Sequence, residues 1–79
     1  MDMIEKYRNT FKKAFSLDDD FDVESLQFNG IPEWDSVGHM DLVAEIEDAF
    51  DIMLETEEII GLDSYAKGLE VLRAHDVSI

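Results

Sequence analysis

Apolar residues recur at steps of three and four near the start of the chain, and this spacing constrains the fold more than any other feature. The residues in the series are Met3, Ile4, Tyr7, Phe11, Ala14 and Phe15. Such spacing places them on one face of an α-helix over Met3–Phe15. We find no alternation typical of a strand elsewhere, so the sequence predicts an all-α fold.

A long connection separates this helix from the next one. Short polar side chains in Ser16–Asp22 compete for backbone hydrogen bonds and end the first helix. The connection continues to about Trp34 and is too apolar to hang free, so we expect it to pack across the helices. The second helix opens at Asp35, a preferred N-cap residue, and runs to about Asp51.

Two more helices are predicted in the last third of the chain. Thr56 is an N-cap candidate for a single helical turn, which Gly61 ends. The last helix begins at Asp63 or Ser64 and contains Gly68, which costs about 1 kcal/mol relative to alanine. This helix must therefore rely on packing. The chain is expected to form a small bundle of three longer helices and one short helix.

Size and charge limit the functions open to the chain. Seventy-nine residues suit one domain, residues 1–79, without a roomy catalytic cleft, and we expect no enzyme. The net charge of -14 argues against a nucleic-acid partner. Between Lys13 and Lys67 there are sixteen acidic residues and no Lys or Arg. This stretch indicates a surface for basic partners, with a merely solvated surface as the alternative.

Several kinds of site and location are not expected from the composition. The chain has no cysteine, which excludes disulfides and thiolate sites, and its two histidines are too few for a multi-histidine metal centre. No apolar run approaches the ~20 residues of a membrane span. The first ten residues also lack the apolar core of a signal peptide. We expect a soluble, cytoplasmic monomer.

The second predicted helix has two distinct faces. One face is assigned to the core and contains Leu42, Val43, Ile46, Ala49 and Phe50. The opposite face mixes apolar groups with carboxylates, a composition suited to transient docking. Its residues are Val37, Met40, Asp41, Ala44 and Asp48.

Ser36 is the strongest candidate for a chemical role. Its hydroxyl follows the Asp35 cap and lies at the positive end of a helix dipole, where phosphate is favoured. An Asp-Ser pair by itself also suits an ordinary first-turn serine. The surrounding segment, EWDSVGHMDLVAEIEDAFDI, resembles the phosphopantetheine attachment region of acyl carrier proteins, whose signature is Asp-Ser-Leu or a close variant. The resemblance extends over the whole chain.

This resemblance implies an acyl-carrier-like fold without catalysis of its own. A phosphopantetheinyl transferase would move 4'-phosphopantetheine from coenzyme A onto Ser36, and the prosthetic thiol would carry acyl groups between biosynthetic enzymes. In the family, an apolar seam shelters the acyl chain, and the matching positions are Leu42, Ile46, Leu54 and Ile59. The carboxylates that would face basic patches on acyl-loading, condensing or acyltransferase enzymes are Asp35, Asp41, Glu47 and Asp48, with apolar contacts from Val37 and Met40.

Departures from the family pattern indicate which kind of acyl carrier the chain resembles. Gly38 stands where fatty-acid-synthesis carriers usually have an acid. Together with Trp34 and His39, it makes the segment more similar to stand-alone carriers of specialised pathways. The Gly-Gly-x-Ser arrangement of peptidyl carriers is absent, although aminoacyl loading stays open. An acidic adaptor that docks partners without being modified is the other alternative.

The sequence contains two other candidate sites. Asp18, Asp20 and Asp22 imitate calcium-loop ligands, but the following glycine and glutamate positions do not match, which leaves weak divalent-cation binding open. A hydrolase using Ser36 and His39 would lack an oxyanion site and a Gly-x-Ser-x-Gly elbow. We expect His39 to be a partly buried structural residue packed near the long connection.

Overall fold

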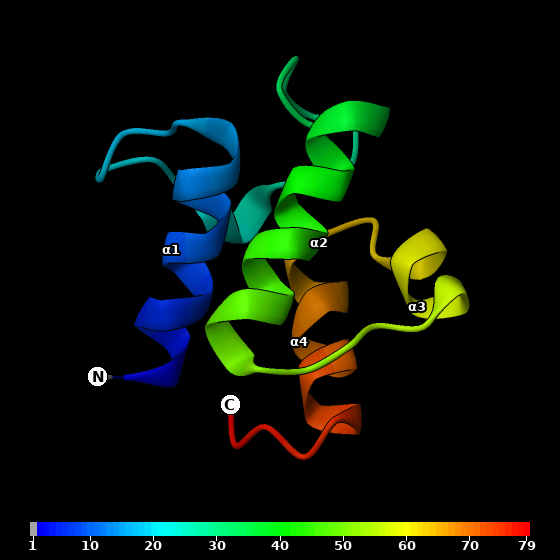
Figure 1. Ribbon diagram of the computed structural model, residues 1–79. Helices are drawn as coiled ribbons and strands as arrows, with labels where there is room; N and C mark the ends of the chain where they lie inside the picture. Colours follow the sequence, from blue (N-terminus) through cyan, green and yellow to red (C-terminus); the bar gives the residue numbers. More distant parts are fainter. Residues whose placement is uncertain (1) are drawn as a thin grey trace.

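The computed structural model describes residues 2–79, which form four α-helices and one short 3-10 helix (Figure 1). The elements are α1 (Met3–Phe15), η1 (Val23–Ser25), α2 (Ser36–Phe50), α3 (Thr56–Gly61) and α4 (Tyr65–Ala74). Over these residues there is no strand, and the predicted all-α bundle of three longer helices and one short helix is confirmed. No helix in residues 2–79 is long and apolar enough to cross a membrane.

The ends of α1 and α2 follow local signals in the sequence. The predicted bounds of α1 are confirmed, and the helix ends where Ser16 adopts a left-handed conformation with φ 54°. The predicted N-cap of α2 is also confirmed, because one Asp35 carboxylate oxygen accepts hydrogen bonds from the backbone N–H groups of Val37 and Gly38. Asp51 ends α2 with φ 53°.

The start of α3 differs from the prediction by one residue. Thr56 is the first helical residue, and Glu55 is the N-cap. The Glu58 side chain stabilises this start by accepting the Glu55 backbone N–H at 2.9 Å. Gly61 was predicted to end this helix, but it is the last helical residue, and Leu62 is the C-cap. At α4, Ser64 is the N-cap, and its hydroxyl accepts the Lys67 N–H.

An aromatic cluster connects α1 with the long connection and α4. The face of α1 predicted to be apolar buries Tyr7, Phe11 and Phe15. Phe11 and Phe15 pack on the fully buried Trp34, with ring centroids 5.6 and 5.4 Å from the indole. Phe11 also contacts Tyr65 of α4 at 5.4 Å. The connection therefore packs across the helices, as predicted.

Gly68 allows α4 to approach α1 closely. The Tyr7 hydroxyl donates a hydrogen bond to the Tyr65 carbonyl oxygen at 2.6 Å, in a buried setting. Burial raises the pKa of the Tyr7 hydroxyl, so the group remains a proton donor. A Cβ atom on Gly68 would overlap this hydroxyl oxygen. The close contact between α1 and α4 therefore offsets the lower helix propensity of glycine at position 68.

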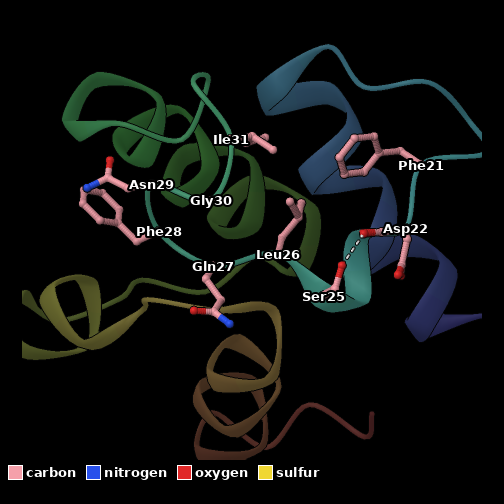
Figure 2. Close-up of a pocket in the computed structure, with 9 residues that line it drawn as sticks. All are labelled: Phe21, Asp22, Ser25, Leu26, Gln27, Phe28, Asn29, Gly30 and Ile31. Atoms are coloured by element: carbon pink, nitrogen blue, oxygen red, sulfur yellow. Dashed lines mark hydrogen bonds between the residues drawn. The ribbon is translucent and has the colours of Figure 1, made fainter.

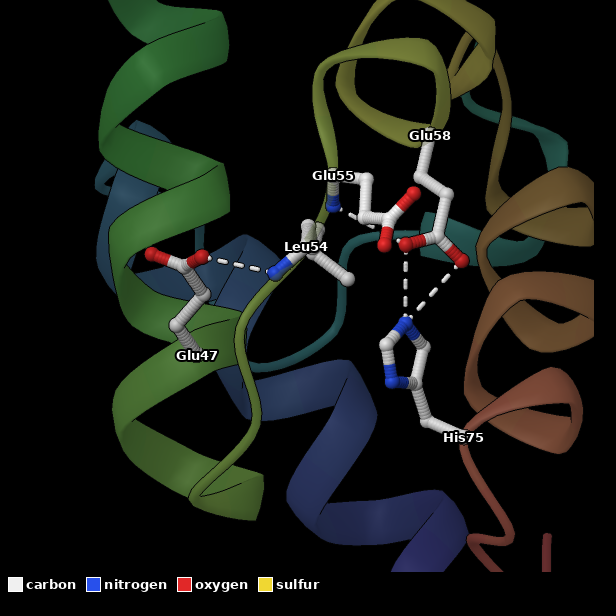
Figure 3. A network of polar contacts seen from close by, with 5 residues as sticks. All are labelled: Glu47, Leu54, Glu55, Glu58 and His75. Atoms are coloured by element: carbon white, nitrogen blue, oxygen red, sulfur yellow. Dashed lines mark hydrogen bonds and ion pairs between the residues drawn. The ribbon is translucent and has the colours of Figure 1, made fainter.

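A small polar network fastens the segment around α3 (Figure 3). His75 directly follows α4. Its Nε2 atom lies 2.8 and 3.0 Å from the two Glu58 carboxylate oxygens. Glu47 of α2 accepts the Leu54 backbone N–H at 2.9 Å. The Glu55 N–H and, next, His75 lower the pKa of the Glu58 carboxyl, because both hydrogen-bond to its charged form.

We predict that Gly68→Ala destabilises the protein by about 1 to 3 kcal/mol, since the added methyl group displaces Tyr7. Gly61→Ala is the matched control, because a Cβ at Gly61 would meet no atom within 4 Å. Urea unfolding of both variants would measure the difference. Equal stability of the two variants would contradict the account of the α1 and α4 contact.

We also predict that Glu58 stabilises the fold in a pH-dependent way. The lowered pKa means that its contribution is present above the ordinary glutamate value of 4.5 and is lost as pH falls through the folded-state pKa. Glu58→Gln should therefore be less stable than the wild type near neutral pH, with the gap closing in acid. Glu57→Gln, an exposed neighbour with the same charge change, serves as the control. A gap that stays constant with pH would refute the prediction.

Candidate functional site

Ser36 is the first residue of α2 and is exposed to solvent. The Asp35 carboxylate beside it is directed to the helix end, at 3.1 Å from the Val37 nitrogen and 2.8 Å from the Gly38 nitrogen. Among residues 2–79, no group forms a hydrogen bond with the Ser36 hydroxyl. The hydroxyl is therefore exposed at the start of a capped helix.

Gly38 has a steric role at this helix start. A Cβ atom there would overlap the Glu33 carbonyl oxygen and would lie 3.3 Å from the Phe15 ring. The backbone of the connection thus crosses α2 at a distance that only glycine permits. From the sequence, Gly38 is only a departure from a family pattern, because its contact with the Glu33 carbonyl depends on the path of the connection.

His39 forms hydrogen bonds through both ring nitrogens. The Trp34 Nε1–H group donates to His39 Nδ1 at 2.9 Å, and the Ile59 carbonyl oxygen lies 2.7 Å from Nε2. This pattern assigns the proton to Nε2 of a neutral ring. The prediction of a partly buried structural histidine is confirmed. Neither ring nitrogen is free to deprotonate Ser36, so a Ser36–His39 hydrolase is not supported.

A cavity of about 250 Å³ opens beside Ser36. Its lining is mostly apolar and comes from the connection, the start of α2, and the segment of α3 with the residues after it. The lining residues are Phe28, Ser36, His39, Ile59, Ile60, Leu62 and Asp63. An apolar group attached to Ser36 would therefore have an apolar surface within reach.

The acyl-pocket residues expected from the sequence divide between this cavity and the core. Ile59 lines the cavity. Leu42, Ile46 and Leu54 are buried in the hydrophobic core and are not among the lining residues. Sequence reasoning missed Phe28, Ile60 and Leu62. Ile60 and Leu62 lie within three residues of Ile59 in the sequence, but Phe28 is more than thirty residues away, and no local pattern connects it with Ile59.

A second, larger cavity of about 570 Å³ lies under the long connection (Figure 2). It extends from Phe21 to Ile31 and is lined by polar as well as apolar side chains, among them Asp22, Ser25, Gln27 and Asn29. Phe28 lines both cavities, whereas Ser36 lines only the smaller one. The larger cavity does contain the Ser25 hydroxyl, but that hydroxyl donates a hydrogen bond to the Asp22 carbonyl oxygen at 3.2 Å and lies in η1, away from any α-helix start.

The predicted docking face of α2 is exposed. Val37 is 74% exposed and Met40 is 52% exposed. Asp41, Ala44 and Asp48 are exposed on the same helix. Two carboxylates of the predicted set have other contacts: Asp35 caps α2, and half-buried Glu47 holds the Leu54 N–H. Val37, Met40, Asp41, Ala44 and Asp48 are exposed along this face, and the Asp35 side chain is exposed beside them.

The aspartates before η1 lie near basic residues of α1. The Lys12 ammonium group donates to the Asp19 carbonyl oxygen at 2.9 Å, and Arg8 lies 2.8 Å from the Glu24 carboxylate. Across residues 2–79, no group of three or more His, Cys, Asp or Glu side chains is placed to hold a metal ion. Asp18, Asp20 and Asp22 therefore do not converge on a shared cation position.

The site so described consists of an exposed serine, an apolar cavity beside it and an acidic helix face. Comparisons of the chain with protein-family models, with curated proteins and with solved structures found no match.

Proposed function

We propose that this chain is an acyl carrier protein of the cytoplasm, with 4'-phosphopantetheine attached to Ser36. The observation that carries the proposal is an exposed serine hydroxyl at the start of a capped helix, next to an apolar cavity. Within residues 2–79, this hydroxyl has no hydrogen-bond partner. When bound, the group supplies a thiol that holds acyl intermediates as thioesters. The chain itself has no catalytic residue in this proposal.

Attachment requires a base that the chain does not provide. The Ser36 oxygen would form a bond to the phosphorus atom that carries the pantetheine arm, and the pyrophosphate bond of coenzyme A would break and release adenosine 3',5'-bisphosphate. His39 cannot take the serine proton, because its Nδ1 atom accepts the Trp34 N–H and its Nε2 atom is protonated. A phosphopantetheinyl transferase would therefore supply both the base and the phosphate-binding groups.

The helix start supports a flexible attachment. Asp35 already occupies the N–H groups of Val37 and Gly38, so a phosphodiester on Ser36 would not replace it as the cap. A negative group would also be repelled by the Asp35 carboxylate. The helix end would therefore not hold the phosphate tightly, which suits a carrier whose arm must reach several enzymes.

The exposed face of α2 supports docking to basic partners. Asp41 and Asp48 lie on the same face as Val37 and Met40, so a partner with a basic rim and an apolar centre would fit it. Exposed ion pairs contribute only about 0 to 1 kcal/mol each. Charge on this face would therefore speed and orient encounter more than it would raise affinity, which suits release after each transfer. The partners would be the transferase and enzymes that load, condense or transfer acyl groups.

We predict that incubation with coenzyme A and a broad-specificity phosphopantetheinyl transferase adds one phosphopantetheine group to the protein. Intact mass and peptide mapping would place it on Ser36, and Ser36→Ala would remain unmodified with unchanged helicity. Ser64→Ala is a useful control, because Ser64 also stands at a helix start but caps it through its side chain. An unmodified wild type, under conditions that convert a control carrier, would contradict the proposal and favour the unmodified acidic adaptor.

A further prediction concerns the docking face. Asp41→Lys should lower kcat/KM for modification of Ser36 by about fivefold or more at low salt, because it replaces an attraction with a repulsion. Asp18→Lys changes the net charge equally but lies outside α2, so it should have a much smaller effect. The comparison needs two salt concentrations and a check that both variants are folded. Equal losses in the two variants would mean that the acidic residues act as a diffuse field.

A further inference from the structure

The cavity under the long connection is large enough to hold a small organic ligand. Its volume of about 570 Å³ lies within the roughly 300 to 1,000 Å³ of pockets that bind such ligands. The cavity beside Ser36, at about 250 Å³, is below that range. Figure 2 shows Phe28 at one end of the larger cavity and Phe21 at the other. The larger cavity is therefore the better candidate for a ligand site.

The backbone around this cavity is held by hydrogen bonds. The Gly30 N–H donates to the Gln27 carbonyl oxygen at 2.7 Å, and the Asn29 N–H donates to the Trp34 carbonyl oxygen at 3.0 Å. Asn29 adopts φ 65°, a left-handed conformation in which asparagine is enriched. Leu26, which also lines the cavity, is buried in the core. The walls of the cavity are therefore formed before any ligand binds.

Two side-chain amides at this cavity have hydrogen-bonding groups to offer a ligand. Gln27 and Asn29 are exposed, and within residues 2–79 neither side-chain amide forms a hydrogen bond. Figure 2 shows a bond at the cavity only from the Ser25 hydroxyl to the Asp22 carbonyl oxygen. Each free amide can both donate and accept. Together with the aromatic rings at the two ends, these groups match a neutral ligand with amide groups and apolar segments.

Phe28 connects this cavity with Ser36, because Phe28 lines both cavities and Ser36 lines the smaller one. A pantetheine arm is about as long as five residues of extended chain, or roughly 16 Å, so an arm on Ser36 can reach past Phe28. The arm contains two amide groups and an apolar dimethyl segment. Its only charge is the phosphate at the Ser36 end, which the Asp22 carboxylate would keep out of the larger cavity.

We propose that the cavity under the long connection binds the pantetheine part of an arm on Ser36 while no enzyme holds the arm. The identity of this ligand rests on the proposed function. Gln27 and Asn29 form hydrogen bonds with the amide groups of the arm, and Phe28 contacts its dimethyl segment. Because the arm is tethered, its effective concentration at the cavity is millimolar, so weak binding suffices. A partner enzyme can therefore withdraw the arm readily.

The test uses isotope-filtered nuclear Overhauser effects in the modified, full-length chain. Transfer from unlabelled coenzyme A onto the isotope-labelled chain makes the arm the only unlabelled part. We expect cross-peaks from the arm amide protons to the side-chain amides of Gln27 and Asn29, and from the arm methyl groups to the Phe28 ring. Cross-peaks from the arm only to α2 and α3, or none beyond Ser36, would overturn the proposal.

Two variants test the contribution of the side-chain amide. Gln27→Ala should lower the ratio of bound to free arm about fivefold, as for the loss of one hydrogen bond. Asn9→Ala is the matched control, because it removes an amide of α1 that lines a different cavity, and it should leave the ratio unchanged. The chemical shifts of the arm amides measure the ratio. Equal ratios in the two variants would overturn the role of Gln27, and the wild-type cross-peaks decide the proposal if Gln27→Ala fails to fold.

A titration of the unmodified chain with free pantetheine separates this proposal from the proposed function. We expect the side-chain amide signals of Gln27 and Asn29 to shift at millimolar pantetheine. If Ser36 cannot be modified, the proposed function fails, and unshifted Gln27 and Asn29 signals would then overturn the cavity as a pantetheine site as well. If Ser36 is modified but the arm does not contact the cavity, the proposal fails and the proposed function stands.

Discussion

The Trp34 side chain must bury a large ring and satisfy one N–H group, and the way both needs are met orders much of the molecule. The ring packs against Phe11 and Phe15 of α1, and the N–H group donates to His39 of α2. Because Trp34 directly precedes the Asp35 cap, its burial also sets where α2 begins and where Ser36 is presented. Through His39, the same interaction extends to α3.

Charge is the second constraint on the fold. The bases of α1 contact groups elsewhere in the chain: Arg8 pairs with Glu24 at 2.8 Å, Lys13 approaches Glu45 at 3.8 Å, and Lys6 lies 5.2 Å above the Phe50 ring. Each exposed contact is weak, but together they place the few cations of the chain against its acidic part. The acidic face around Asp41 remains exposed, where external cations or basic partners can approach it.

Local signals in the sequence predict the helices, but they do not predict the contacts between the helices. The cap at Asp35 and the apolar face of α1 are encoded within a few residues, and both were predicted correctly. The start of α3 was misplaced by one residue because Glu55 and Glu58 cap it together. The residues around the Ser36 cavity depend on how Phe28 meets α3, a contact across more than thirty residues. The hydrogen bond from the Leu54 N–H to the Glu47 carboxylate depends on the path of the chain after α2, and no local pattern predicts it.

The central claim is that Ser36 carries a covalently attached arm in the working protein. The most direct measurement is peptide mapping by mass spectrometry of the protein purified from cells that produce it naturally. The account predicts that the peptide containing Ser36 carries phosphopantetheine, with a free thiol or an acyl group at its end, and that the peptides containing Ser16, Ser25, Ser64 and Ser78 carry none. The claim would be contradicted if the Ser36 peptide were unmodified in all of the purified protein while other carriers from the same cells were modified.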